Sequence, residues 1–280
     1  MSQNGLCPLC GAPSLRLRRF AVLSQFEAEL CECGSCGFIF VAEPHWLEGS
    51  FSSQLNRLDV GSVDRTLLMS QFVRGLMGAS PDRRSWKLLD FGGGDGLLTR
   101  LVRDVGVDCR WEDPYCEPVF AVGPPHDEVD HFDLAVMSEV ALHLTDPVGT
   151  FADLISRSDR VLFTATVPPN PIPPDWWYLM PSTGQHVAFY PTTAIAGLAS
   201  QLGVNWCSDG KFFHLLSRTP IEQSTRLLMR NAAVPLLLAQ TWAAIDLYRR
   251  ARGTKVSLMV SDQNRLAADL ATTTEGTTYG

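Results

Sequence analysis

The stretch "LLDFGGGDGLLTRLV", residues 88–102, decides the fold of this chain. It begins as a short apolar run, continues with glycines at alternate positions, and ends in the apolar period of a helix. Gly92, Gly94 and Gly96 let the backbone turn sharply and let a ligand approach closely. Strand, glycine turn and helix in this order predict an α/β domain that holds a cofactor at the turn.

Features on either side of the turn narrow the choice of cofactor. The pattern G-G-G-D-G differs from the G-x-G-x-x-G of pyrophosphate-binding turns, which argues against a nucleotide-dependent oxidoreductase. Asp90 precedes the turn, at a place suited to a cationic amine. The second strand, in "DCRWEDPY" (108–115), ends in Glu112 and Asp113, where a carboxylate can bind both ribose hydroxyls. A nucleoside that carries an amino acid and no pyrophosphate satisfies all three features, and S-adenosylmethionine is such a molecule.

The cysteines near the N-terminus predict a metal site. "CPLCG" (7–11) and "CECGSCG" (31–37) each contain C-x-x-C followed by glycine, and 22 residues separate the two pairs. Two thiolates three positions apart can reach one tetrahedral ion, so the spacing predicts a zinc ribbon. The predicted ligands of a structural Zn²⁺ are Cys7, Cys10, Cys33 and Cys36. Cys31 is a spare that could replace Cys33, and the absence of a visible export signal argues against disulfides.

At these residues the chain resembles class I S-adenosylmethionine-dependent methyltransferases, and more closely the bacterial group with an N-terminal zinc-binding segment. The resemblance covers residues 5–217 and rests on an ordered series of motifs. The series is "CPLCG…CGSCGFIF", "HWLEGSFSS" (45–53), "DFGGGDG" (90–96), "EDPY" (112–115), "SEVALHLTDP" (138–147) and "WWYLMPSTGQHVAFY" (176–190). The chain departs from the group at Leu142, where an acid is usual, and in the short stretch 116–130, which compresses the third strand and its helix.

The resemblance implies a Rossmann-like α/β fold with a seven-stranded methyltransferase sheet. Strands are expected in "FDLAVMSEV" (132–140) and "RVLFTATV" (160–167), and a closing antiparallel hairpin in 203–218 with its turn at Asp209-Gly210. The expected domains are a zinc ribbon (1–44), a methyltransferase domain (45–218, with a helical lead-in at 45–84), a helical extension (219–270) and a disordered tail (271–280). The expected cofactor residues are Asp90, Gly92, Gly94, Gly96, Asp113 and Glu139.

Two histidines are candidate catalytic bases. In-line methyl transfer needs mainly positioning, but a hydroxyl or activated-carbon acceptor benefits from a base. His186 is the first candidate and His143 the second; alternatively, His186 holds the aromatic segment in place and His143 caps a helix or binds a carbonyl. The proline-rich stretch 168–175 is expected to hold Trp176, Trp177 and Tyr178 as apolar walls of the acceptor pocket, and His214 is expected to pack inside a strand.

Composition bears on the acceptor and the compartment. The 280 residues carry a formal net charge of −7, and "RLRRF" (16–20) reads as a solvated strand face, which argues against a nucleic-acid surface. The apolar stretch 232–248 contains Pro235, Gln240 and Asp246, so it predicts a buried or interface helix instead of a membrane span, with a homo-oligomer through the C-terminal helices as one use. We therefore expect a cytoplasmic methyltransferase acting on a small molecule or a sugar.

Two further functions remain open at this point. A zinc-ribbon RNA-modifying methyltransferase would use the ribbon to dock RNA, and the acidic charge counts against it. A non-catalytic S-adenosylmethionine-binding or assembly protein would keep the fold without the chemistry, and Leu142 favours that reading.

Overall fold

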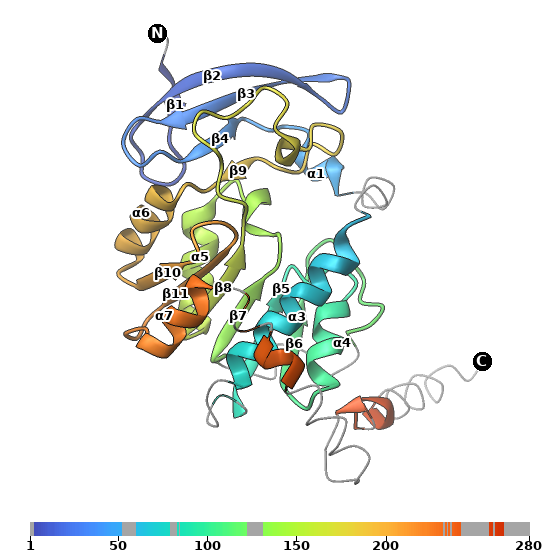
Figure 1. The fold of residues 1–280 in the computed structure, drawn as a ribbon. Coiled ribbons are helices and arrows are strands. Elements are labelled where there is room, and N and C mark those ends of the chain that lie inside the picture. Colours follow the sequence, from blue (N-terminus) through green and yellow to red (C-terminus); the bar gives the residue numbers. More distant parts are fainter. Residues whose placement is uncertain are drawn as a thin grey trace, which may run out of the picture. The chain divides into compact units, whose positions relative to one another are not determined.

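The computed structural model describes residues 3–51, 60–78, 83, 85–121, 131–231, 233, 235, 237–241, 258–259 and 261–265. These residues belong to two compact units, described separately below: residues 1–63 with 139–230, and residues 64–138 with 231–280 (Figure 1). The predicted tail at 271–280 and most of the predicted helical extension lie outside the described residues. The predicted domain boundaries and the homo-oligomer stay predictions.

The first unit contains a five-stranded antiparallel sheet with the order β1-β2-β3-β4-β9. Its strands are β1 (Gln3–Leu6), β2 (Pro13–Val22), β3 (Phe26–Cys33), β4 (Ile39–Ala42) and β9 (Ala188–Phe189). The strand expected over the basic stretch 16–20 is therefore confirmed as part of β2. On the exposed face of β2, Arg16 and Arg19 form ion pairs with Glu29, which confirms that this basic stretch is a solvated strand face.

The first unit also contains three strands in the order β10-β11-β8, with β11 antiparallel to both neighbours. The strands are β8 (Arg160–Thr164), β10 (Asn205–Ser208) and β11 (Phe213–Ser217). The predicted hairpin turn is confirmed: Gly210 has a φ of 75°, and the Asp209 carboxylate accepts the backbone N–H groups of residues 211–213. An acidic residue followed by glycine suits this turn because the first caps free N–H groups and the second tolerates positive φ.

Six helices of the first unit lie among the described residues, and one of them has a typical N-terminal cap. They are α1 (Leu47–Ser50), η3 (Ala141–His143), α5 (Pro147–Arg157), η4 (Trp177–Leu179), α6 (Thr192–Leu202) and α7 (Gln223–Arg230). Asp146 caps α5 by accepting the N–H of Gly149, and Pro147 occupies the first helical position. Within the described part of the chain, no helix is both long and apolar enough to cross a membrane.

A hydrophobic core joins the five-stranded sheet to the aromatic segment 176–189. Sheet residues such as Leu30 and Val41 pack with Trp176, Tyr178 and Leu142 in one buried cluster. Backbone hydrogen bonds connect the same segments: Val41 N donates to Val187 O, and Val187 N donates to Leu142 O, each at 2.8 Å. Leu142 is fully buried, so its side chain contributes packing at the position where the related group carries an acid.

The second unit contains three parallel strands in the order β7-β5-β6. They are β5 (Lys87–Phe91), β6 (Asp108–Glu112) and β7 (Leu134–Met137), and helices α3 (Ser62–Gly78) and α4 (Leu97–Arg103) accompany them. Every residue of β7 is buried, as expected for a parallel strand covered on both faces. The predicted strand, glycine turn and helix at 88–102 are thus confirmed.

Six of the seven predicted strands are among the described residues, namely β5, β6, β7, β8, β10 and β11. The compressed third strand was expected within residues 116–130, and residues 122–130 lie outside the described part of the chain. The seventh strand therefore stays a prediction.

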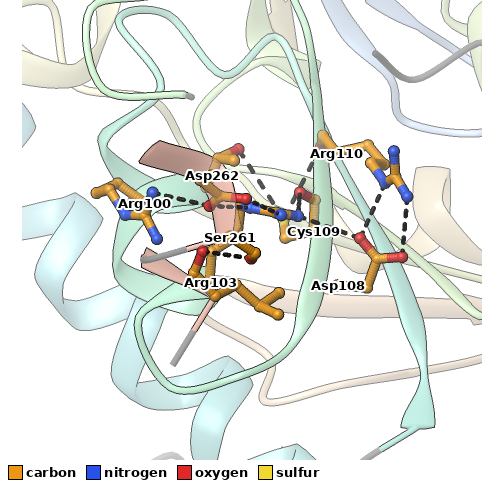
Figure 2. Close-up of polar contacts among 9 residues, drawn as sticks. Arg100, Arg103, Asp108, Cys109, Arg110, Ser261 and Asp262 are labelled. Atoms are coloured by element: carbon orange, nitrogen blue, oxygen red, sulfur yellow. Dashed lines mark hydrogen bonds and ion pairs between the residues drawn. The ribbon is translucent and has the colours of Figure 1, made fainter. Parts of the chain in front are cut away.

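An ion-pair network fastens Asp262 to α4 inside the second unit (Figure 2). Arg103 and Asp262 are each 3% exposed, and Arg103 Nε donates to Asp262 Oδ2 at 2.8 Å. Arg100 binds the same carboxylate at 3.0 Å, and Arg103 also reaches Asp108 at 3.1 Å. Because each buried charge has a partner of opposite sign, the segment around residue 262 is held on α4 by specific contacts.

Candidate functional site

The glycine turn of the second unit leaves an open backbone cradle after β5. Gly94 has a φ of 56° and its N–H donates to Asp113 Oδ2 at 2.9 Å, while Gly92 N donates to Glu112 O at 2.8 Å. Gly96 begins α4 with a φ of 83°, and a Cβ at this residue would lie 2.2 Å from the Cβ of Ala121. Only glycine satisfies both constraints, so the turn is shaped for backbone approach to a ligand.

Asp113 stands at this turn with both carboxylate oxygens engaged. Oδ2 accepts the Gly94 N–H, and Oδ1 accepts the N–H groups of Tyr115 at 2.8 Å and Cys116 at 3.0 Å. The side chain is half-buried, so one carboxylate is held in a fixed orientation directly beside the glycines. This is the placement that the sequence predicts for the ribose-binding acid.

Asp90 lies deeper in the second unit than the other predicted cofactor residues. It is 1% exposed, and its Oδ2 accepts both the backbone N–H and the hydroxyl of Thr99, at 3.1 and 2.9 Å. Burial raises the pKa of this carboxyl to about 7. These bonds join the end of β5 to the first turn of α4, so Asp90 positions the glycine turn, and its contact with a cofactor amine stays a prediction.

The four predicted zinc ligands converge in the first unit. Their sulfur atoms all lie within 4.8 Å of one another; the closest pairs are Cys10 with Cys33 at 3.4 Å and Cys7 with Cys36 at 3.8 Å. Backbone N–H groups point at the sulfurs, as Leu9 N does at Cys7 and Cys36 N at Cys33, both at 3.4 Å. Four thiolates in a compact, amide-lined cluster form a donor set suited to tetrahedral zinc and leave no coordination position for catalysis.

Cys31 lies outside this cluster. It sits inside β3, two residues before Cys33, and is fully buried. Burial raises the pKa of its thiol, which favours the neutral form. Among the described residues, the group of cysteines whose sulfur atoms lie close enough to hold one metal ion contains Cys33 and not Cys31.

His186, the first candidate base, is held by the backbone of the aromatic segment. Its Nδ1 lies 2.6 Å from the carbonyl oxygen of Tyr178, and the two rings meet edge-on with centroids 4.9 Å apart. A carbonyl oxygen only accepts hydrogen bonds, so Nδ1 carries the proton and Nε2 carries the lone pair of the neutral ring. The imidazole is half-buried.

Glu139 is tied to the same tyrosine. The Tyr178 hydroxyl donates to Glu139 Oε2 at 2.9 Å and accepts the N–H of Thr166 at 3.1 Å. Burial, together with the Glu139 charge, raises the pKa of this phenol, so it stays a donor. Glu139 also has a φ of 58°, a strained value for a non-glycine residue that fits a functional position.

His143 lies beside His186. The ring centroids are 5.6 Å apart, and the ring of Phe51 also contacts His143, with the centroids 5.5 Å apart. The structure therefore brings the two candidate bases of the first unit together. His214 is fully buried between Ser208 and the carbonyl of Ala165, which confirms that it is a packed residue.

The expected aromatic walls are found only in part. Trp176 is 8% exposed and Tyr178 is 2% exposed, so both pack in the core of the first unit, whereas Trp177 is 68% exposed. Apolar rings serve a core as well as a pocket, and the sequence does not distinguish the two uses. The sequence did not predict that Tyr178 contacts both Glu139 and His186, because the pattern "WWY" does not distinguish the tyrosine from the two tryptophans in this respect.

Comparison with known proteins agrees with the predicted fold. A model of a methyltransferase domain matches residues 64–207. No curated protein is significantly similar to the chain.

The solved structures to which the chain is similar include methyltransferases of low sequence identity. The mitomycin 7-O-methyltransferase is 16% identical, with a TM-score of 0.39 and 54% of each chain covered. The magnesium protoporphyrin IX methyltransferase of Synechocystis PCC 6803 with bound SAM is 12% identical, with a TM-score of 0.41 over 62% of this chain and 95% of the other. The 1,6-didemethyltoxoflavin-N1-methyltransferase of Burkholderia thailandensis is 15% identical, with a TM-score of 0.44 over 71% and 97%.

The chain spans about half the length of the mitomycin enzyme. The family model, in contrast, matches more than half of the 280 residues of this chain. The chain therefore belongs to the methyltransferase domain family.

Proposed function

We propose that this protein is an S-adenosylmethionine-dependent methyltransferase that acts on a hydroxyl or an activated carbon of a small molecule or sugar, with His186 as general base. The observation that carries the proposal is the 2.6 Å contact between His186 Nδ1 and the Tyr178 carbonyl. S-adenosylmethionine supplies an activated methyl group as its methyl–sulfur bond breaks. Nε2 of His186 takes the acceptor proton as the new bond to the methyl group forms, and Nδ1–H keeps the ring in the orientation that this requires.

The remaining predicted residues take supporting roles in the proposal. Asp113 binds the ribose, Gly92, Gly94 and Gly96 accommodate the amino-acid end of the cofactor, and Glu139 and Asp90 complete the cofactor set. Zn²⁺ on Cys7, Cys10, Cys33 and Cys36 is structural. Four reduced thiols suit a reducing compartment, so we assign the protein to the cytoplasm.

A small acceptor fits the charges of the described surface better than RNA does. Arg16 and Arg19 of β2 are paired with Glu29, and Arg19 also with Glu27, so this basic stretch is largely neutralised. The whole chain has a net charge of −7. Phosphate binding needs clustered, unneutralised cations, which argues against the ribbon as an RNA-docking element.

Labelled S-adenosylmethionine tests the proposal. Incubation of the protein with methyl-labelled cofactor and cell extract, followed by size fractionation, should place protein-dependent label in the low-molecular-weight fraction. Label that sediments with RNA and is released by ribonuclease would support the RNA-modifying alternative instead. Absence of label in every fraction, with the cofactor bound, would favour a non-catalytic protein.

Asp113→Ala should weaken binding of S-adenosylhomocysteine by about 1.5–3 kcal/mol, because it removes charge-assisted hydrogen bonds to the ribose. Calorimetry measures this change, and the label transferred at low cofactor concentration should fall with it. Glu117→Ala, an exposed acid four residues further on, is the matched control. Unchanged affinity in Asp113→Ala would move the ribose contact to another residue.

Tyr178→Phe should raise the Kd of S-adenosylhomocysteine about tenfold if the phenol positions Glu139 for the cofactor. Tyr190→Phe is the control, because Tyr190 is equally buried in the same unit and its hydroxyl donates to the Ala141 carbonyl at 2.8 Å. Both variants should lose some stability in denaturant, but only Tyr178→Phe should lose affinity. Equal affinities would show that the Tyr178 hydroxyl serves the fold alone.

A further inference from the structure

A pocket of about 560 Å³ opens in the first unit, at the turn that joins β2 to β3. Residues 23–26 of that turn form one side, His45 and Trp46 form another, and Ser182 of the aromatic segment also lines it. This volume is typical of sites for small molecules. None of the functions described above uses this pocket.

Ring surfaces dominate one part of the lining. Phe26 stacks on Trp46 with an interplanar angle of 20°, and His45 lies edge-on to both rings at centroid distances of 5.3 and 5.1 Å. Trp46 is buried, whereas Phe26 is half-buried and His45 is exposed, so these two rings present surface to a ligand. His45 Nδ1 lies 3.3 Å from the Glu43 carbonyl, which fixes the proton on Nδ1 and makes Nε2 an acceptor.

Neutral polar groups supply the rest of the lining. Ser24, Gln25 and Ser182 offer hydroxyl and amide groups that both donate and accept, and no charged side chain occurs among the described residues that line the pocket. A phosphate or carboxylate would find no cation here, and a cationic ligand would find no carboxylate. The lining is therefore suited to an uncharged ligand with an apolar face and a hydrogen-bonding rim.

Strained backbone gathers around the same pocket. Among the described non-glycine residues, five have positive φ, and four of them flank it: Leu23, Ser24, Glu43 and Met180. The turn is closed by the bond from Gln25 N to Val22 O at 3.1 Å and is fastened to the aromatic segment by Leu23 N, which donates to the Pro181 carbonyl at 2.8 Å. Strain of this kind costs about 1–3 kcal/mol per residue and is found mainly where function requires a fixed shape.

We propose that this pocket binds a neutral, flat heterocyclic ring. The planes of Phe26 and His45 are 85° apart, so such a ring stacks its face on Phe26, meets His45 edge-on, and places its rim against Ser24, Gln25 and Ser182. A sugar ring fits less well because its hydroxyls project on every side, while Leu23 and Gly49 offer them no side-chain partner and the Trp46 N–H already donates to the Gly184 carbonyl at 3.0 Å.

The pocket also contacts the segment that carries His186. Gly184, which accepts the Trp46 N–H, precedes His186 by two residues, and a Cβ at Gly184 would lie 2.9 Å from Trp46 Nε1. A ring bound here would thus belong to the acceptor, an assignment that rests on the proposed function. Binding of the ring itself does not depend on methyl transfer.

Theophylline is a suitable probe, because it is a neutral, flat heterocycle that carries both donors and acceptors. We expect it to shift the amide signals of Ser24 and Gln25 and the indole signal of Trp46 in a saturable manner in NMR titrations. The protein is first saturated with S-adenosylhomocysteine, which blocks the cofactor site and confirms that the methyltransferase fold is intact.

Two variants and one control make the result specific. Gln25→Ala and Phe26→Leu should each raise the Kd of theophylline at least fivefold, whereas Gln201→Ala, exposed on α6, should leave it unchanged. Absence of saturable shifts, or shifts that survive both variants, would overturn the proposal. So would methyl α-glucoside binding at these residues more tightly than theophylline. Since S-adenosylhomocysteine affinity is measured in the same samples, failure of this pocket is distinguishable from failure of the proposed function.

Discussion

Cys10→Ser should abolish stoichiometric zinc and unfold the five-stranded sheet of the first unit. Elemental analysis is expected to find one zinc per chain in the wild-type protein and far less in the variant. Structural zinc contributes about 10–16 kcal/mol to folding, which is as large as the whole stability of a typical domain. Because Cys10 is exposed, the serine itself disturbs little packing, and the loss reports on the metal.

The sheet explains why metal loss should also stop turnover. The cluster joins the turn after β1 to the turn after β3, and the pairing of β4 with β9 continues the sheet to Ala188. His186 lies two residues before β9 begins, so unfolding of the sheet releases the segment that holds it. Near-ultraviolet circular dichroism should record the loss of fixed aromatic packing in the same sample.

Two cysteine variants serve as controls for the zinc prediction. Cys116→Ser changes a half-buried thiol in the second unit and should keep the metal and the dichroism signal. Cys31→Ser changes a buried thiol outside the cluster and should keep the metal even if stability falls. Full zinc in Cys10→Ser, or its loss in Cys31→Ser alone, would contradict the ligand set.

Local patterns in the sequence predicted the parts of the site that depend on local backbone. The glycine turn needs positive φ at Gly94 and Gly96, and the backbone of each C-x-x-C pair forms a turn closed by a local hydrogen bond, so neighbouring residues determine both. The choice between Cys31 and Cys33 depended instead on where β3 ends, which is set by pairing with β2 and β4. No spacing rule contains that information.

Tertiary contacts determined what the sequence missed. β9 has only two residues, too few to show a period, and its partner β4 lies far away in the chain. Tyr178 became a link between Glu139 and His186 because the core buries its ring while its hydroxyl and carbonyl face different partners. The role of Leu142 also depends on tertiary contacts, because its fully buried side chain belongs to a core formed by segments that are distant in the sequence.

His186→Ala should lower turnover by about 100-fold or more while the affinity for S-adenosylhomocysteine stays nearly constant. The reason is that Nε2 of His186 would lose its role as proton acceptor, whereas the cofactor residues are untouched. Wild-type turnover should also rise with pH as the neutral imidazole that can accept a proton forms, and the variant should lose this dependence.

His186→Asn separates a base from a residue that only orders the segment. The asparagine amide can donate to the Tyr178 carbonyl, as Nδ1 of His186 does at 2.6 Å, but it cannot accept a proton. If His186 is the base, the asparagine variant is as slow as the alanine variant. If His186 only orders the segment, asparagine restores turnover, and the alanine variant changes the KM of the acceptor more than kcat.

His143→Ala completes the comparison, because its ring lies 5.6 Å from that of His186 and either imidazole could meet the same proton. A base at His143 would reverse the outcome: the His143 variant would lose turnover and the pH dependence, and the His186 variants would retain both. Wild-type turnover in every variant would exclude a histidine base. The reaction would then depend on alignment of the acceptor with the methyl group alone, as in-line transfer to an already ionised acceptor allows.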